Sequence, residues 1–467
     1  MENRDVVILG AGPAGYAAAI RAAQLGGRVT IIEKEMFGGT CLNRGCVPVR
    51  VLTRAVELLE TAARAKDYGV VFKEVSVDFA KLMNRKNVAV KTLVAGVRML
   101  LAGNQVEILE GAARLVAPGE VAVSGADGNA ATLHTRNIII ASGSRCGALP
   151  PEGGERALNT ATVLELQEIP RSIAIVGAGF VGVSFATIFA HLGTKVTLID
   201  GKAGMLTGMD AEIVGMYERE LKKSKVGYLP QTALGQCTQK PDGDLDIVVE
   251  GGGQEARLSV QYLLMAEDRV PNIDGIGVEA IGMRRTDRGG IAVDRQMKTN
   301  VPGVYAAGDI TMENMWTPVA YREGIVAAEN AMGKTSSVDY SGIPLWTNTL
   351  PSLAAVGLTE ELAKAAGHEV KVGRFWFAGN GMATILGQRS GLIKLVTEAK
   401  YGQVLGVHIM GPNAAELINQ GTLALKLEVT PEEIGNVFYA HPSLSETFWE
   451  AAKDVHGEAI HFLSANK

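Results

Sequence analysis

Short apolar runs, each ending in a turn residue or an acid, recur along the chain. In one segment the runs 6–9 and 29–32 flank an alanine-rich stretch, and in another the runs 173–176 and 196–199 flank a second helical stretch. A continuous apolar run of this length, followed by a turn, is typical of a buried strand in a parallel sheet. The pattern therefore predicts two similar strand–turn–helix–strand units.

Other runs predict strands outside these units. Residues 137–141 form one strand, and residues 299–309 form another that stops at Gly-Asp. The polar stretch 124–129 predicts a hairpin turn between two short strands. The C-terminal part differs, because it lacks glycine-rich turns of the earlier kind. Its apolar pattern predicts the strands 391–396 and 404–410 and an amphipathic helix over 414–427, which we interpret as a separate domain for association or substrate binding.

Both units carry the glycine spacing G-x-G-x-x-G directly after their first strand. The glycines are Gly10, Gly12 and Gly15 in the first unit and Gly177, Gly179 and Gly182 in the second. The first glycine permits the tight turn, the second lets the backbone approach a pyrophosphate, and the third lets helix and strand pack closely. Glu33 and Asp200, each 23 positions after the first glycine, would accept hydrogen bonds from a ribose hydroxyl. We therefore predict two dinucleotide sites.

Two cysteines follow the first unit in the segment GGTCLNRGC, residues 38–46. Cys41 and Cys46 are five positions apart, so at the start of a helix their sulfurs come close enough to bridge if the first turn is distorted. A helix N-terminus also lowers the pKa of a thiol, which makes the thiolate available for disulfide exchange. The alternative is a pair of buried structural cysteines. The flanking glycines and the preceding dinucleotide unit favour a redox-active pair.

Composition and charge exclude several classes of protein. A chain of 467 residues with 47% apolar and 20% charged residues is expected to form several globular domains. The net charge of −5 argues against a nucleic-acid partner. No apolar run approaches the roughly 18 residues of a membrane span, and the first run is too short for a signal peptide. Four cysteines are too few for a secreted disulfide framework. We expect a cytoplasmic protein without membrane, nucleic-acid or metal sites.

The motifs occur in the same order as in the pyridine nucleotide–disulfide oxidoreductases. The chain resembles this family over essentially its whole length, and within the family it is most similar to the dihydrolipoamide dehydrogenases. The resemblance rests on the two glycine turns, on GGTCLNRGC, on TNVPGVYAAGD at 299–309 and on AHPSLSE at 440–446. It implies an α/β fold with two Rossmann-like dinucleotide-binding domains, for FAD and NAD(H), and a C-terminal α+β dimerisation domain. The implied limits are 1–147 and 269–342 for the two parts of the FAD-binding and central region, 148–268 for the NAD(H)-binding domain, and 343–467 for the dimerisation domain.

The resemblance also implies a relay. Hydride would move between NAD(H) and one face of the flavin, while Cys46 lies next to the ring and Cys41 exchanges with the substrate. His441 would accept the proton, since an ordinary histidine pKa lies near working pH, and Glu446 would orient its ring. His441 would serve the cysteines of a partner subunit, so that a homodimer shares its active sites. Further cofactor-binding residues implied by the resemblance are Gly39, Thr40, Arg50, Ser142, Gly143, Gly308 and Asp309, the last at the ribityl chain.

Three positions depart from the family pattern. The family usually has Lys where this chain has Arg50, Glu where it has Ser184, and Gly where it has Asp268. The Lys and Glu normally pair between flavin and nicotinamide, and the planar guanidinium of Arg50 is not interchangeable with an ammonium group. Asp268 adds a negative charge where backbone should approach the dinucleotide. We therefore expect slow hydride transfer from NADH.

The predicted activity is oxidation of a dihydrolipoyl dithiol, on a carrier protein or a small molecule, with NAD⁺ as final acceptor. Two alternatives stay open at this point. One is a reductase for another small disulfide, of the glutathione type. The other is a flavoprotein subunit of a multienzyme complex that turns over NAD(H) weakly.

Overall fold

The computed structural model of the chain describes residues 4–125, 130–267 and 269–463. Its internal contacts divide it into two compact units. The first comprises 1–51, 80–148 and 268–340, and the second comprises 52–79, 149–267 and 341–467. Each unit contains one of the two predicted strand–turn–helix–strand segments, and the second also contains the C-terminal region. The expected α/β fold class is thereby confirmed.

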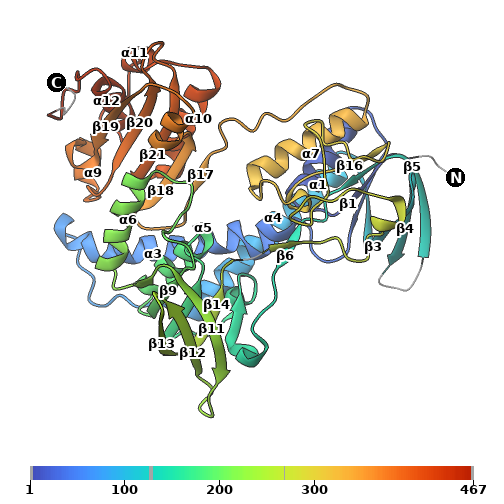
Figure 1. Ribbon diagram of the computed structural model, residues 1–467, viewed down its shortest axis with the longest axis horizontal. Coiled ribbons are helices and arrows are strands. Elements are labelled where there is room, and N and C mark those ends of the chain that lie inside the picture. The colour runs from blue at the N-terminus through green and yellow to red at the C-terminus, as the bar shows by residue number, and fades with distance from the viewer. Residues whose placement is uncertain (1–3, 126–129, 268, 464–467) are drawn as a thin grey trace. The chain divides into compact units, whose positions relative to one another are not determined.

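A parallel sheet with covered faces forms the centre of the first unit. Its order is β3-β2-β1-β5-β16, from β3 (Glu107–Ala117), β2 (Val29–Glu33), β1 (Arg4–Leu9), β5 (Ala130–Ile140) and β16 (Val304–Ala306). Helices α1 (Pro13–Gln24) and α7 (Thr317–Ala331) lie side by side against β1 and β16 (Figure 1). Gly324 permits this close helix contact, because a Cβ there would lie 2.1 Å from the carbonyl oxygen of Ala14. Strand β1 is buried on both faces, which explains its unbroken apolar run.

Antiparallel pairs complete this unit. The long strands β3 and β5 each pair with β4 (Glu120–Gly125), and β6 (Ser144–Cys146) pairs with β15 (Arg269–Pro271). The expected hairpin turn at 124–129 falls between β4 and β5, but residues 126–129 lie outside the described residues. The expected strand over 299–309 was too long. Only β16 is a strand there, because Gly303, with φ +74°, turns the chain after Pro302.

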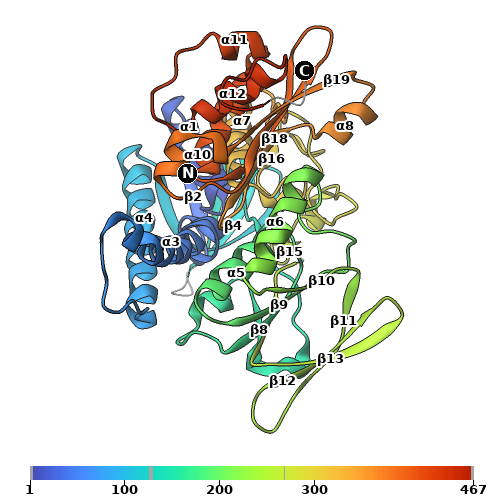
Figure 2. The same cartoon turned by 90° about the vertical axis from the view of Figure 1, so that its left-hand side faces the viewer.

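The second unit begins with another parallel sheet, of order β10-β9-β8-β14-β7. The strands are β7 (Ala157–Asn159), β8 (Ser172–Val176), β9 (Lys195–Ile199), β10 (Gly227–Leu229) and β14 (Tyr262–Met265). Helix α5 (Phe180–His191) follows the glycine turn after β8 and packs on β8 and β9 (Figure 2). The antiparallel strands β11 (Thr232–Gln239), β12 (Leu245–Gly251) and β13 (Gln254–Val260) add a small sheet.

The C-terminal region of this unit is an antiparallel sheet of order β17-β18-β21-β20-β19 with helices packed on it. Its strands are β17 (Leu345–Trp346), β18 (Ser352–Gly357), β19 (Val370–Trp376), β20 (Leu392–Glu398) and β21 (Val404–Gly411). Strands β20 and β21 and helix α10 (Ala414–Lys426) correspond to the two strands and the helix predicted from the pattern. Helix α10 packs on β18 and β21, and α12 (Glu446–Asp454) packs on β19 and β20.

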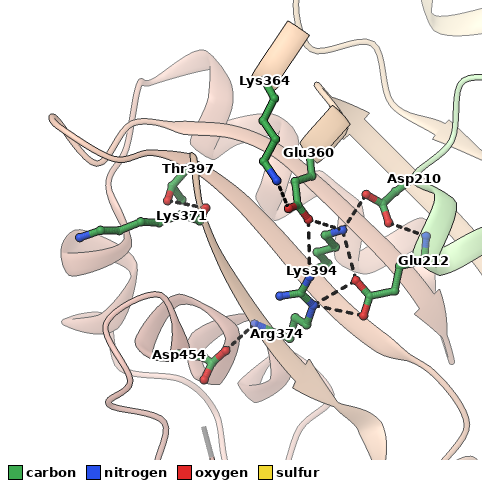
Figure 3. Close-up of polar contacts among 9 residues, drawn as sticks. All are labelled: Asp210, Glu212, Glu360, Lys364, Lys371, Arg374, Lys394, Thr397 and Asp454. Atoms are coloured by element: carbon green, nitrogen blue, oxygen red, sulfur yellow. Dashed lines mark hydrogen bonds and ion pairs between the residues drawn. The ribbon is translucent and has the colours of Figure 1, made fainter. Parts of the chain in front are cut away.

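A cluster of charged side chains joins α6 (Ala211–Lys223) to the C-terminal sheet within the second unit (Figure 3). Lys394 of β20 lies at its centre, with its side chain 4% exposed. The Nζ atom of Lys394 is 2.9 Å from Asp210, 3.2 Å from Glu212 and 3.0 Å from Glu360. Arg374 contacts the last two carboxylates as well. The cluster therefore fastens the second dinucleotide-binding segment to the C-terminal sheet.

Candidate active site

The glycines of the first turn differ in what surrounds them. Gly10 has φ +100°, and a Cβ there would lie 2.5 Å from the carbonyl oxygen of Ala141 at the end of β5. A Cβ on Gly15 would lie 1.9 Å from the carbonyl oxygen of Gly10, so helix α1 packs tightly on the turn. Apart from its chain neighbours, a Cβ on Gly12 would have only the Cα of Gly39 within 4 Å among the described residues, at 3.7 Å. The absence of a side chain at Gly12 therefore leaves room for a phosphate at the start of α1.

Glu33 lies at the end of β2 and is held by the main chain. Its two carboxylate oxygens accept hydrogen bonds from the amides of Ala11, at 2.7 Å, and Glu35, at 2.9 Å. A cavity of about 280 Å³ adjoins it and is lined in part by Phe37 and Ser124. Each carboxylate oxygen retains a second lone pair. This arrangement fits the adenosine end of a dinucleotide.

The two cysteines lie on successive helices. Cys41 is in α2 (Gly39–Arg44) and Cys46 begins α3 (Cys46–Arg64), so the expected single helix start is interrupted at Gly45. Both are free thiols, Cys41 half-buried and Cys46 exposed. The hydrogen bond between the two sulfurs is the largest influence on both pKa values. It raises the pKa of Cys41 and lowers the pKa of Cys46, against the raising effect of desolvation on the latter. The hydrogen bond therefore favours the proton on Cys41 and the charge on Cys46.

Thr317, the first residue of α7, is a neighbour of this pair that sequence reasoning missed. Its Oγ lies 3.4 Å from the Cys46 Sγ. One turn further along α7, the hydroxyl of Tyr321 accepts a hydrogen bond of 2.7 Å from Tyr16. No recognised motif marks Thr317. The only signal in the sequence is its place at the start of the helix after the Gly308-Asp309 turn.

Asp309 and its neighbours form a network at the end of β16. Ser144 donates to the Asp309 carboxylate at 2.6 Å, and Arg269 donates to the Ser144 hydroxyl at 2.8 Å. The amide of Gly308 donates to Glu323, a buried carboxylate whose pKa burial raises to about 7. Glu323 was also missed by sequence reasoning.

The predicted residues Ser142 and Gly143 have a structural partner in Asn272. The Ser142 hydroxyl donates to the backbone carbonyl oxygen of Asn272. The backbone amide of Asn272 donates to the carbonyl oxygen of Gly143. These contacts hold the segment after β5 against the segment after β15. Thr40, half-buried, lies in α2 beside Cys41. These residues, the two cysteines and the first glycine turn all lie in the first unit.

The second glycine turn has the same backbone form as the first. Gly177 has φ +102°, and a Cβ on Gly182 would lie 1.7 Å from the carbonyl oxygen of Gly177. Asp200 is 2% exposed, and its oxygens accept hydrogen bonds from the amides of Ala178, at 2.9 Å, and Lys202, at 2.8 Å. Glu267 lies against the turn, with its Cγ only 2.1 Å from where a Cβ on Gly177 would stand. Sequence reasoning missed this additional carboxylate beside the expected phosphate site.

Two of the three departures can be placed. Arg50 is exposed on α3. Ser184 is 3% exposed, and its hydroxyl donates to the carbonyl oxygen of Phe180 at 2.6 Å and accepts a hydrogen bond from the amide of Asn348 at 3.1 Å. Asp268 lies outside the described residues. Ser184 is thus part of a contact between α5 and the segment after β17.

His441 and Glu446 form a pair in the second unit. The Nδ1 of His441 is 2.8 Å from Glu446, whose other oxygen accepts the amide of Ser443 at 2.8 Å. Burial opposes ionisation of Glu446, but the hydrogen bonds from His441 and Ser443 outweigh it and lower its pKa. The His441 side chain is 79% exposed. The carboxylate thus orients an imidazole that is open to solvent within this chain.

Two dinucleotide-binding turns and a thiol pair directly after the first define a nucleotide-dependent thiol–disulfide oxidoreductase. Residues 4–332 match the pyridine nucleotide-disulphide oxidoreductase family, and residues 343–452 match the dimerisation domain of that family. The chain belongs to this family. Its members use FAD and NAD(H), and the two turns fit those cofactors.

Relatives and solved structures agree with this assignment. The chain is 39% identical over 461 residues to the dihydrolipoyl dehydrogenase of Geobacillus stearothermophilus, with 98% of both chains covered. It is 39% identical over 470 residues to the enzyme of that name from Thermus scotoductus, with 99% of this chain and 100% of the relative covered. LpdA from Mycobacterium tuberculosis superposes with a TM-score of 0.89 at 26% identity, covering 96% of this chain and 98% of LpdA.

A second similar structure is the Cu(II) complex of the HOCl-induced flavoprotein disulfide reductase RclA from Escherichia coli. It superposes with a TM-score of 0.86 at 25% identity, covering 97% of this chain and 99% of RclA. The dimerisation domain supports a homodimer. Among the described residues, no helix is both long and apolar enough to cross a membrane.

Proposed function

We propose that this chain is a dihydrolipoyl dehydrogenase, which oxidises a dihydrolipoyl dithiol through the Cys41–Cys46 disulfide. The observation that carries the proposal is the pair Cys41 and Cys46 on successive helices directly after the first dinucleotide-binding turn, in a chain of the pyridine nucleotide-disulphide oxidoreductase family. The hydrogen bond between the two sulfurs raises the pKa of Cys41 and lowers the pKa of Cys46, which favours the charge on Cys46. A pair with this asymmetry has a preferred thiol for exchange and a preferred leaving group.

The exchange proceeds in two steps. One substrate thiolate attacks the Cys41 sulfur, the Cys41–Cys46 bond breaks, and its electron pair passes to Cys46 as a thiolate. The second substrate thiolate then attacks the sulfur that is bonded to Cys41, which closes the substrate disulfide and releases the Cys41 thiolate. The cysteine pair is thereby reduced by two electrons. Bound FAD supplies the route by which these electrons reach NAD⁺.

The base for the substrate thiols is His441. Its imidazole is exposed and oriented by Glu446, as expected for a group that serves a site outside its own chain. The lowered pKa of Glu446 keeps the carboxylate charged, which stabilises the protonated imidazole. In the homodimer, each His441 then completes the active site built around the Cys41–Cys46 pair of the partner.

Substrate choice is tested with a panel on the purified flavoprotein. Dihydrolipoamide, free and attached to a carrier protein, is compared with glutathione disulfide, each with NAD(H) and NADP(H). We expect turnover of the lipoyl substrates and a higher kcat/KM with the carrier-bound form. Turnover of glutathione disulfide that exceeds lipoyl turnover would move the protein to the alternative reductase class.

The shared site is tested by mixing inactive chains. Chains with His441→Ala are combined with chains carrying Cys41→Ser, and subunit exchange is verified with differently tagged partners. In a mixed dimer one site has both an intact cysteine pair and an intact base, so part of the activity should return. No recovery despite exchange would place the base within its own chain, while the cysteine chemistry would stand.

A further inference from the structure

The hydroxyl of Thr317 is directed at the redox sulfur instead of the helix backbone. Within a helix, a threonine hydroxyl commonly bonds to the carbonyl three or four residues earlier. Thr317 is the first residue of α7, so no preceding helical turn offers such a carbonyl. Its Oγ lies 3.4 Å from the Cys46 Sγ. The hydroxyl is therefore within hydrogen-bond distance of Cys46, and it also lowers the pKa of Cys41.

The ionisation state of Cys46 decides the direction of this hydrogen bond. A thiolate has no proton to donate, so the Thr317 hydroxyl must be the donor whenever Cys46 is charged. A hydrogen bond to an ionised acceptor is stronger than a neutral one and favours the charged form. After the larger effects of Cys41 and desolvation, the Thr317 contact contributes to the lowered pKa of Cys46.

A backbone hydrogen bond at Cys46 also lowers its pKa, but the other side chains around the two sulfurs do not supply this stabilisation. The charge of Asp309 raises the pKa of both thiols. Burial raises the pKa of Tyr16 and of Tyr321, and the thiol charges add to this, so both phenols stay neutral. Among the described residues, the side chains that hydrogen-bond the Cys46 sulfur are those of Cys41 and Thr317.

Of these two side-chain donors, only Thr317 can still donate a hydrogen bond to Cys46 while the substrate is bonded to Cys41. When the substrate is bonded to Cys41, that sulfur carries no proton and cannot hydrogen-bond Cys46. At this stage the Cys46 thiolate has just left and must be held until the second exchange step. We propose that Thr317 is a positioning residue whose hydroxyl holds and stabilises the Cys46 thiolate during this stage. The inference rests on the roles proposed above for the two cysteines.

The stage can be reproduced with Cys41→Ala, which removes the other donor while Cys46 and bound FAD remain. In this background the Cys46 thiolate should give a long-wavelength flavin absorbance band, and its appearance with rising pH reports the pKa of Cys46. Adding Thr317→Val should move this titration upward by about one pH unit, a tenfold change in proton affinity. Adding Thr317→Ser, which keeps the hydroxyl, should leave it within a few tenths of a unit.

Tyr321→Phe is the matched control. It removes a hydroxyl one turn further along α7, but this hydroxyl contacts Tyr16 and not a cysteine. We expect no shift of the titration from it. Thr317→Ala replaces the valine variant if the added methyl group disturbs the helix start. The pH dependence of Cys46 alkylation in the same holoenzymes, followed by mass spectrometry at that residue, should show the same order of variants.

The outcomes separate the two proposals. Equal titrations for Thr317→Val and Thr317→Ser would overturn the role of the hydroxyl and leave the cysteine chemistry intact. If Cys41→Ala shows no band at any pH while Cys46→Ala with intact Cys41 does, the roles of the two cysteines are reversed. The Thr317 proposal then falls, while oxidation of the dihydrolipoyl dithiol by the pair stands.

Discussion

Replacement of Lys394 by methionine tests the charged cluster that joins α6 to the C-terminal sheet. The change keeps the length and apolar stem of the side chain and removes its charge. Arg374 still contacts Glu212 at 3.0 Å and Glu360 at 3.5 Å, so these two carboxylates retain a cation. Asp210, whose side chain is 3% exposed, loses the ammonium group at 2.9 Å. It keeps a hydrogen bond of 3.1 Å from the amide of Glu212.

The cost follows from burial. Removing one partner of a buried ion pair destabilises a protein by about 3–5 kcal/mol, because an uncompensated charge stays behind. One such carboxylate is left here, so we expect Lys394→Met to lower the free energy of unfolding by about 3 kcal/mol. Adding Asp210→Asn removes the stranded charge, and the double variant should therefore be more stable than Lys394→Met alone.

Lys364→Met provides the comparison within the same cluster. Lys364 is 59% exposed and pairs with Glu360 at 2.6 Å across one helical turn. Exposed pairs of this spacing contribute about 0.3–0.5 kcal/mol. Urea titrations of the flavoprotein at constant FAD would measure all four proteins. If Lys394→Met costs no more than Lys364→Met, the cluster does not fasten α6 to the sheet and the reasoning from burial is wrong.

Three further predictions concern the cofactors and pH. NADH should reduce the flavin on the order of a hundredfold more slowly than dihydrolipoamide reduces the cysteine pair, the expected effect of a misplacement of about 1 Å. The double variant Arg50→Lys and Ser184→Glu should speed flavin reduction by NADH more than either change alone. If stopped-flow measurements show that NADH and dihydrolipoamide reduce the unaltered protein at equal rates, the prediction is wrong. Asp200 should make kcat/KM higher with NADH than with NADPH, and the reverse order in steady-state kinetics would refute this. Burial raises the pKa of Glu323 from 4.5 to about 7 in the folded protein. This shift stabilises the folded state fully below pH 4.5, and the stabilisation is lost as the pH rises through 7. Glu323→Gln should remove this pH dependence of the free energy of unfolding, about 3 kcal/mol, as measured by urea denaturation at different pH values. If the variant and the unaltered protein lose stability with pH in parallel, Glu323 does not titrate in this range.

The sequence by itself determined the features that depend on near neighbours in the chain. The two glycine turns, the strands on either side of them and the spacing of Cys41 and Cys46 are local patterns. Each reports a backbone constraint that only particular residues satisfy, such as φ +100° at Gly10 and φ +102° at Gly177. The fold class followed from them. The strand expected over 299–309 was too long, because an apolar run alone does not show where Gly303 turns the chain.

Only the tertiary structure decided which distant side chains meet. Thr317 lies 271 positions from Cys46, and Lys394 lies 184 positions from Asp210. A threonine at a helix start and a lysine in a strand have ordinary surroundings in most proteins, so neither carries a pattern that a sequence can reveal. The same holds for Ser184. In the sequence it is a departure from the family's glutamate, but in the structure its hydroxyl accepts a hydrogen bond from the backbone amide of Asn348. These contacts arise from the packing of helices on sheets, and their energies depend on burial that no local spacing specifies.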